Sequence, residues 1–288
     1  MNQKYLPSVL LIALACIWGS SFILMKRGLE VFSYEEVAAL RLSLAFLALA
    51  PFGISHLLKI PRKSAFAMAV VGIVGNGIPA FLFTKAQTQV DSSLAGALNA
   101  LTPLFTVVIG FIFFQMRLKL LNNIGVLIGL IGAVLLVNPF GIEGGSNWTY
   151  SLYIVVATIC YATSVNVIKH FLQGYSALQV TLTGLFFAAP LPIIYLIGTG
   201  MPSKLVTVDG AWMAFMYISI LAVVGTALSV VMFNQLIKIT SPIFASSVTY
   251  LIPIVALVWG MLDGEELKLI EFLAMGLVLT GVYLVNKK

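Results

Sequence analysis

Charge is what this sequence has least of. Only 9% of its 288 residues are charged and 60% are hydrophobic, whereas a soluble domain carries roughly 25% charged residues. This composition excludes an ordinary soluble enzyme or binding domain and predicts a polytopic membrane protein within a lipid bilayer. The formal net charge of +6 comes from Lys and Arg residues scattered singly between apolar segments. It therefore indicates membrane topology and no nucleic-acid partner.

Residues that catalyse reactions or bind metals are equally scarce. The two cysteines, Cys16 and Cys160, lie inside apolar segments and form no CxxC or Cys/His spacing. The two histidines, His56 and His170, are expected near helix ends, away from any cysteine or carboxylate cluster. P-loop, HExxH and GxSxG motifs are missing. The sequence thus predicts no catalytic residues, no metal site and no cofactor.

Carboxylates are missing from the middle of every apolar run. All ten Asp and Glu residues fall in loops or near helix ends. A proton-coupled antiporter usually keeps a membrane-embedded carboxylate that titrates during transport. This absence argues against that mechanism, although coupling through a carboxylate at the rim stays open.

Long apolar runs, in contrast, are abundant. Ten of them, each of roughly 18–24 residues, are long enough to cross a hydrocarbon core of about 30 Å. They predict transmembrane helices at 6–26, 34–54, 64–84, 92–115, 121–138, 150–169, 177–198, 211–233, 242–262 and 269–286.

The second half of the sequence repeats the first. Ala95–Pro103 returns 150 positions later as Ala245–Pro253, and Trp18–Lys26 matches Tyr161–Lys169 at a shift of 143. Residues 1–141 and 142–288 are therefore expected to form two repeats of five helices each. Because five is odd, the second repeat is inverted if the linker around Glu143–Thr149 does not cross the membrane. The predicted fold is an all-α integral membrane protein, with ten transmembrane helices in two inverted repeats around a central cavity.

The charges of the loops indicate the orientation. With the N-terminus in the cytoplasm, ten Lys and Arg residues fall on the cytoplasmic side and five on the outer side, while Arg41 lies within the second helix. Because positive charge collects on the cytoplasmic side, both termini are expected in the cytoplasm.

Polar side chains inside the apolar runs gather on the first, third, fourth, sixth, eighth and ninth expected helices. Since an unpaired polar group in hydrocarbon is costly, they predict a polar-lined interior. The residues expected to bind substrate there are Trp18, Asn76, Asn99, Tyr161, Thr249 and Tyr250. The alternative is structural: interhelical hydrogen bonds for the polar groups and packing for Trp18 and Tyr161. Pro103 and Pro253, near midspan, predict kinks that either gate a path or shape packing.

Two cations are candidates for a role in charge recognition. Arg41 lies about two turns into the second helix, with Glu35 and Glu36 near its start. It either forms an ion pair there, extends to the membrane interface, or attracts an anionic group. Lys85, at the end of the third expected helix, can act in the same way.

An ordered set of short motifs runs through the chain: Ile17–Phe22, Leu40–Leu42 with Arg41, Ala95–Pro103, Gly125 with Gly132, Ala245–Pro253, Gly264–Leu267 and Gly281. With these motifs in this order, nearly all of the chain resembles the drug/metabolite transporter superfamily, in its ten-helix branch with two EamA domains. The resemblance implies a basket-like bundle whose central cavity faces one side of the membrane at a time. It also implies transport of small metabolites, with amino acids and related compounds as common substrates.

Two departures from the family pattern limit what the resemblance implies. The second half has Glu265-Glu266 where the first has Gln115-Met116, so the acidic turn occurs only once. The small four-helix multidrug relatives carry a glutamate in their first helix, and the matching position here is Cys16. Their proton–drug exchange therefore does not carry over to this chain.

Together these features predict a secondary transporter that moves small organic metabolites, foremost amino acids or related compounds, across a bacterial inner membrane by alternating access. Export is the expected direction, and a monomer is compatible with the sequence. The alternatives are an exporter of lipophilic drugs or cations, or of nucleosides or sugars, and a facilitator or channel. A membrane-embedded enzyme would need His or carboxylate groups at membrane depth.

Overall fold

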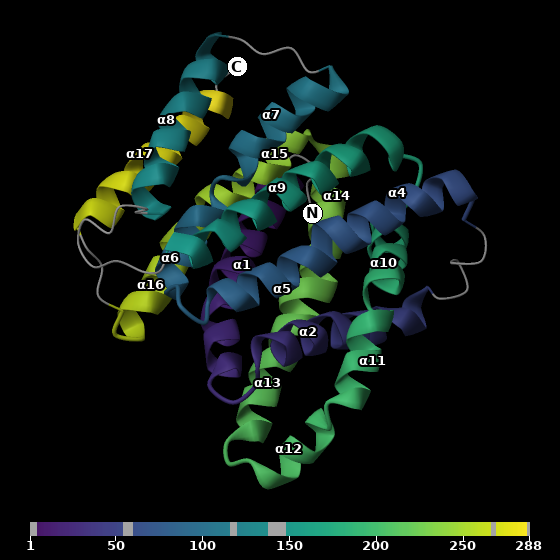
Figure 1. Ribbon diagram of the computed structural model, residues 1–288. Coiled ribbons are helices and arrows are strands. Elements are labelled where there is room, and N and C mark those ends of the chain that lie inside the picture. Colours follow the sequence, from purple (N-terminus) through teal and green to yellow (C-terminus); the bar gives the residue numbers. More distant parts are fainter. Residues whose placement is uncertain (1–4, 54–59, 116–119, 138–147, 266–268, 287–288) are drawn as a thin grey trace.

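The computed structural model describes residues 5–53, 60–115, 120–137, 148–265 and 269–286, and every regular element in these ranges is a helix (Figure 1). His56, Glu266, Leu267 and most of the linker between the halves lie outside the described residues. The α-helices are α1 (Leu6–Leu29), α2 (Tyr34–Leu49), α4 (Arg62–Gly72), α5 (Ile78–Ala86), α6 (Ser92–Asn99), α7 (Thr102–Phe114), α8 (Leu120–Val137), α9 (Trp148–Phe171), α10 (Ala177–Ala188), α11 (Pro190–Gly198), α12 (Met201–Thr207), α13 (Ala211–Ala222), α14 (Ser229–Ile239), α15 (Pro242–Ser246), α16 (Ile252–Leu262) and α17 (Leu269–Asn286).

Six continuous helical stretches in the described part of the chain are long and apolar enough to cross a membrane: Leu6–Leu29, Arg62–Ala86, Ser92–Phe114, Trp148–Phe171, Ala211–Ile239 and Phe244–Leu262. The pair α10 and α11, bent by 42°, makes a seventh if it counts as one span. The expectation of an all-α membrane protein is confirmed. The count of ten spans stays a prediction, because α2 ends at Leu49 and the apolar parts of α8 and α17 are shorter than a full span.

Two of the long stretches contain a π-helical segment near their middle. These segments are η2 (Ile73–Gly77), between α4 and α5, and η3 (Val223–Leu228), between α13 and α14. They lie 150 positions apart, which is the shift of the sequence repeat. A π-helical turn is wider than an α-helical one and changes which backbone groups are bonded, and such turns are frequent at functional sites.

The two repeated prolines lie where helices restart. Pro103 is in the first turn of α7, after the break that follows α6, and Pro253 is in the first turn of α16, after the 3₁₀ segment η4 (Ser247–Tyr250). At these positions proline lacks an N–H that would be unbonded in any case. Helix breaks therefore lie next to both prolines, and the role of the expected kinks, in gating or in packing, stays a prediction.

Helix starts follow the repeat as well. Ser33 begins α2 and accepts a hydrogen bond from the backbone of Glu36, whose side chain accepts one from the backbone of Ser33. Ser176 and Gln179 form the same reciprocal arrangement at the start of α10. Each arrangement bonds two backbone groups that the first turn of a helix otherwise leaves free.

α8 and α17 pack against each other at one side of the molecule (Figure 1). Glycines permit this contact: a Cβ atom on Gly281 would lie 2.4 Å from the backbone nitrogen of Gly129, and one on Gly132 would lie 2.7 Å from that of Val278. Small residues that bring helix backbones together are typical of helix pairs in membranes.

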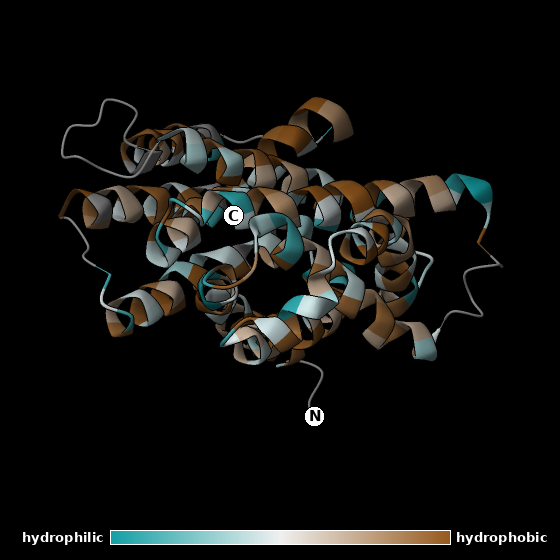
Figure 2. Ribbon diagram, turned by 60° about the horizontal axis from the view of Figure 1, so that its bottom comes forward, coloured by the Kyte–Doolittle hydropathy of each residue, from teal (hydrophilic) through white to brown (hydrophobic). Residues whose placement is uncertain are grey.

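Large apolar side chains cover much of the outer surface, and apolar ribbon recurs throughout the helices (Figure 2). Phe113, Leu191, Ile197 and Leu262, for example, are each at least 73% exposed. A monomer in water rarely exposes apolar patches of such extent. This surface is suited to contact with the lipid of a membrane.

Candidate functional site

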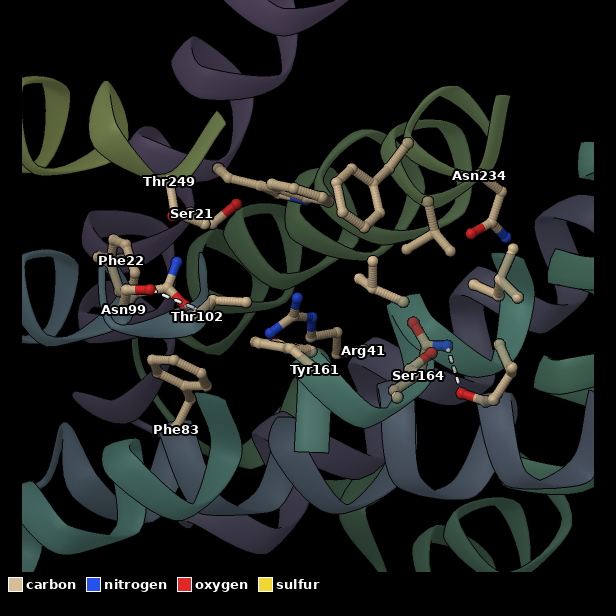
Figure 3. A pocket seen from close by; sticks show the side chains of 18 of the residues that line it. Ser21, Phe22, Arg41, Phe83, Asn99, Thr102, Tyr161, Ser164, Asn234 and Thr249 are labelled. Carbon is tan, nitrogen blue, oxygen red and sulfur yellow. Dashed lines mark hydrogen bonds between the residues drawn. The ribbon is translucent and has the colours of Figure 1, made fainter. Parts of the chain in front are cut away.

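A cavity lies among the broken helices, lined by side chains of α1, α2, α4, α5, α6, α7, α9 and α14 and of the segments η2 and η4 (Figure 3). Its volume is about 90 Å³. Since roughly 10–15 Å³ of such space holds one water molecule, there is room for about six to nine waters or one small solute. The helices α8 and α17 contribute nothing to the lining.

Two pairs of aromatic rings form part of the cavity wall. The ring of Trp18 meets that of Phe233 edge-on, with centroids 5.0 Å apart, and the ring of Tyr161 stacks on that of Phe83 at 5.9 Å. Trp18 and Tyr161 occupy equivalent positions of the repeat, as do Phe83 and Phe233. The repeat thus places the same kind of aromatic pair in the wall twice, offering apolar ring faces to a solute.

The π-helical segments position several lining residues. The indole nitrogen of Trp18 donates to the carbonyl oxygen of Gly225, in η3, at 3.1 Å and to Ser229 Oγ at 3.0 Å. Asn76, in η2, donates from its side-chain amide to the carbonyl oxygen of Val71 at 3.2 Å. Because its indole N–H is already bonded, Trp18 offers mainly its ring to a solute. Asn76 keeps its side-chain oxygen and its second amide N–H without a bond to any described residue.

Arg41 is the single charged side chain among the cavity-lining residues. It is only 9% exposed, and its Nε atom donates to Thr226 Oγ1, in η3, at 2.7 Å. The ion pair with Glu35 or Glu36, one of the expected alternatives, is not formed. Instead, both oxygens of Glu36 accept hydrogen bonds from Lys204 Nζ, at 2.7 and 2.8 Å.

The terminal nitrogens of the Arg41 guanidinium make no hydrogen bond or ion pair with any described residue. Figure 3 shows this group directed into the space that the lining side chains surround. The positively charged guanidinium of Arg41 therefore lies inside the protein, and its two terminal nitrogens are available to a solute. The sequence made Arg41 a candidate, but nothing in it paired Arg41 with Thr226, which lies 185 positions away.

Neutral polar groups come from Asn99, Thr102 and Thr249. The two threonine hydroxyls donate to backbone oxygens three residues earlier in the chain, Thr102 to the carbonyl oxygen of Asn99 and Thr249 to that of Ser246, each at 2.8 Å. The side-chain oxygen of Asn99 accepts only a long bond from Thr102, at 3.5 Å, and its side-chain nitrogen donates to no described residue. Asn99 therefore keeps hydrogen-bonding capacity toward the cavity (Figure 3).

Two candidates from the sequence lie outside the lining. The hydroxyl of Tyr250 donates to the carbonyl oxygen of Val282, in α17, at 2.9 Å. Lys85 Nζ lies 4.8 Å from the ring centroid of Tyr153 and 5.6 Å from that of Tyr34. The cavity therefore brings together six of the eight candidates for substrate binding or charge recognition: Trp18, Arg41, Asn76, Asn99, Tyr161 and Thr249.

A second polar cluster, which sequence reasoning missed, ties the end of α1 to the start of α6 and the turn after α16. We call it the Glu265 clamp: Lys26, Ser92, Ser93, Asp263 and Glu265. Lys26 Nζ lies 2.6 Å from Asp263 Oδ2 and 3.0 Å from Glu265 Oε1. Glu265 also accepts hydrogen bonds from the backbone nitrogens of Ser92 and Ser93, at 3.0 and 3.1 Å, and from Ser93 Oγ at 2.6 Å.

The clamp holds the Glu265 carboxylate in its charged form. Burial raises the pKa of this group. Hydrogen bonds from Ser93, Lys26 and the backbone of α6 together lower the pKa by more than burial raises it, so the pKa of Glu265 lies below its usual value. The start of a helix also favours a negative charge. The sequence shows the acidic turn only in the second half, and it gives no indication of the partners of Glu265, which lie up to 239 positions away.

Chemically, the cavity offers one cation, aromatic faces and a few neutral hydrogen-bonding groups. Its lining residues include no His, Cys, Asp or Glu. In the part of the chain that the structure describes, three or more such residues nowhere gather into a group able to hold a metal ion. The arrangement is suited to binding a small solute.

The chain is similar along most of its length to proteins that are named as membrane transporters. The chain is 28% identical over 289 residues to YedA of Escherichia coli (strain K12), named as an uncharacterized inner membrane transporter; the match covers 96% of this chain and 89% of that protein. It is 24% identical to a probable terminal-alkyne amino-acid exporter of Streptantibioticus cattleyicolor, covering 94% and 90% of the two chains. A solved crystal structure shares the fold, with a TM-score of 0.67 at 15% identity, over 97% of this chain and 96% of its own.

These similarities favour a membrane transporter over an enzyme, and they extend over nearly the whole sequence. The model of the EamA-like transporter family matches residues 6–138 and, separately, residues 148–287. The chain therefore belongs to the EamA-like transporter family.

Proposed function

We propose that this protein is a secondary transporter that moves small organic metabolites across a bacterial inner membrane by alternating access, with the cavity as its substrate site. The observation that carries the proposal is the single lining built by both halves of the chain, from Trp18 to Thr249. Substrate sites of transporters with internal repeats lie at the interface of the repeats, near the bilayer midplane.

A recurring contact supports the division into repeats 1–141 and 142–288. A Cβ atom on Gly75, in η2, would lie 2.2 Å from Ser164 Oγ, and one on Gly225, in η3, would lie 2.9 Å from Ser21 Oγ. The two glycines are equivalent in the repeat, and so are the two serines. The same close approach thus occurs twice with the halves exchanged, as expected for ten helices in two inverted repeats.

The Glu265 clamp supports a closed end of the cavity. It joins α1, α6 and the end of α16, and the distribution of loop charges favours the outer side for it, with both termini in the cytoplasm. In alternating access, these contacts would separate when the cavity opens outward. The protein is proposed to act as a monomer, because the cavity is complete within one chain.

Amino acids or related compounds are the proposed substrates, and export is the proposed direction. The similarity to a protein named as a probable amino-acid exporter supports both. The cavity's small volume and its combination of a cation, amide groups and aromatic faces are compatible with this class. Lipophilic cations, nucleosides and sugars are the competing substrate classes.

Counterflow in proteoliposomes tests the proposal. Vesicles are loaded with an unlabelled amino-acid pool, and the same amino acids, labelled, are followed as they accumulate, with and without a pH gradient. Accumulation above equilibrium establishes exchange by alternating access and excludes a channel. Its absence across neutral, aromatic, cationic and anionic pools, and then across nucleosides, sugars and lipophilic cations, would overturn the proposed function.

A matched pair of variants tests the cavity as the substrate site. Asn99→Ala removes a side chain that faces the cavity with free hydrogen-bonding capacity, and counterflow should fall by about tenfold or more, as for loss of a group that binds substrate. Thr280→Ala removes an exposed hydroxyl of α17 that bonds only to the carbonyl oxygen of Gly276. Equal counterflow in the two variants would move the substrate site elsewhere.

A further inference from the structure

The cavity carries an unbalanced positive charge. Arg41 is 9% exposed, and no other residue of the lining is ionisable as an acid or base at neutral pH. The nearest carboxylate along its own helix, that of Glu36, is bound by Lys204. Since a buried charge without a partner is strongly unfavourable, a negative group that enters the cavity gains more there than a neutral one.

The free part of the guanidinium has the right shape for a carboxylate. Nε is bonded to Thr226 Oγ1, which fixes the plane of the group and leaves the two terminal nitrogens toward the cavity. Two parallel N–H groups match the two oxygens of a carboxylate in a bidentate pair. Thr226 is itself part of the π-helical segment η3, so this orientation depends on the break in the helix.

The remaining lining suits an apolar body. Phe22, Phe83, Tyr161 and Phe233 contribute ring faces, and Val165 and Ile168 contribute aliphatic surface. The lining residues include no carboxylate to receive an ammonium group; the acceptors that they offer are neutral, such as the side-chain oxygens of Asn76 and Asn99 and the ring faces. A solute with a single negative charge and an apolar body therefore complements the cavity better than a zwitterion, and much better than a cation.

We propose that Arg41 is the anchor for the carboxylate of the substrate, and that the site selects small apolar monocarboxylates over zwitterions, neutral compounds and cations. This inference rests on the proposed function and narrows its substrate class. It also predicts an order of affinity among amino-acid-like compounds. Removing the ammonium group from such a compound strengthens its binding, and removing the carboxylate abolishes the advantage over neutral compounds. Lipophilic cations are the class that this site rejects.

Binding of four compounds with one carbon skeleton tests the charge preference. The probes are 4-methylpentanoate, leucine, 4-methylpentanamide and 4-methylpentylamine, measured by isothermal titration calorimetry with the full chain purified in detergent. The expected order is anion, zwitterion, neutral amide, cation, with the anion at least about tenfold tighter than the amide, as for a charge-assisted bidentate contact. Equal affinity for the anion and the amide, or no binding of any probe, would overturn the inference.

Variants assign the preference to Arg41. Arg41→Gln should bind the amide within about twofold of the unchanged protein while losing the anion preference, so retained amide binding also shows that the variant is folded. Arg41→Lys keeps the charge but not the paired N–H groups, and should keep part of the preference. Lys85→Gln removes a cation outside the lining and should change nothing. A preference that survives Arg41→Gln would refute the assignment.

The outcomes separate this inference from the proposed function. If amino acids, nucleosides or sugars show counterflow but the anion is not preferred among the four probes, the proposed transport function stands and the role of Arg41 as a carboxylate anchor is refuted. If binding is anion-selective and the selectivity disappears in Arg41→Gln, but no pool shows counterflow, the proposed binding site stands and the proposed transport mechanism is refuted.

Discussion

Replacement of Glu265 by Gln should destabilise the protein, because this side chain is the centre of the clamp that joins three helices. Its side chain is only 2% exposed and accepts hydrogen bonds from Lys26, from the backbone nitrogens of Ser92 and Ser93, and from Ser93 Oγ. Glutamine has nearly the same shape, but one of its two acceptor oxygens becomes an NH₂ group that faces other donors.

The magnitude follows from the contacts. Hydrogen bonds to charged groups contribute about 1.5–3 kcal/mol each, and removing one partner of a buried ion pair costs about 3–5 kcal/mol. Lys26, however, is 32% exposed, so water screens part of its interaction. We therefore expect Glu265→Gln to lower the free energy of unfolding by about 2–4 kcal/mol, which corresponds to a fall in Tm of about 5 °C or more.

Glu30→Gln is the matched control. Glu30 is 52% exposed and pairs with Arg27, itself 41% exposed, at 2.5 Å. An exposed ion pair of this kind contributes about 0.5 kcal/mol or less. Thermal unfolding of both variants in detergent, followed by tryptophan fluorescence, compares the same chemical change at a buried and an exposed position. Equal shifts in Tm would refute the clamp as a stabilising element.

The pH dependence gives a second readout of the same group. The folded-state pKa of Glu265 lies below its unfolded value, so the carboxylate stabilises the fold fully above the unfolded pKa, about 4.3. This contribution is lost as the pH falls through the folded-state pKa, because the proton binds the unfolded chain more tightly. The neighbouring Asp91 has its pKa raised, by burial and by the charge of Glu265. The difference in Tm between the unchanged protein and Glu265→Gln should therefore persist at neutral pH and shrink below about pH 4.

Three further substitutions test the packing of the fold and the cavity. Gly72→Ala should destabilise the protein by more than about 3 kcal/mol, the upper end of the typical cost of overpacking, because the new Cβ atom would lie 1.9 Å from the carbonyl oxygen of Gly184. An unchanged Tm would contradict the close contact of α4 and α10. Gly276→Ala, which has nothing within 4 Å, should be neutral or slightly stabilising in the same measurement. Trp18→Phe keeps an aromatic ring in the wall but loses its two hydrogen bonds to the η3–α14 region, so Tm should fall by an amount equivalent to about 1–2 kcal/mol; a Tm equal to that of the unchanged protein would show that these bonds do not hold the segment.

Much of the site was visible in the sequence because the repeat marks it. Trp18 with Tyr161, and Asn99 with Thr249, were singled out as equivalent positions, and all four line the cavity. Phe83 and Phe233 are equivalent in the repeat as well, but the sequence does not indicate them as cavity residues, since a Phe in an apolar run carries no signal that separates a cavity wall from a packed core. The π-helical segments were missed for a similar reason: hydropathy does not distinguish a π-helical turn from an α-helical one.

Tyr250 shows where local pattern fails. It follows Thr249 directly and matches Ala100, so sequence position gave no reason to separate it from its neighbour. In the 3₁₀ segment η4, however, consecutive side chains point in different directions, and the hydroxyl of Tyr250 bonds to α17 while Thr249 faces the cavity. Which face of a helix lines the cavity depends on its rotation, which is set by packing against several neighbours.

By itself, the sequence determined the membrane class, the all-α fold, the internal repeat and most of the polar candidates. The length of an apolar run is a local property, and a repeat is found by comparing the sequence with itself, so neither depends on tertiary contacts. Only the tertiary structure decided the partners of the charges. Arg41 bonds to Thr226 and leaves its neighbour Glu36 to Lys204, and Glu265 bonds to Lys26 and the start of α6. Side chains far apart in sequence meet only after the tilt and rotation of every helix are fixed, and that follows from the packing of the whole bundle.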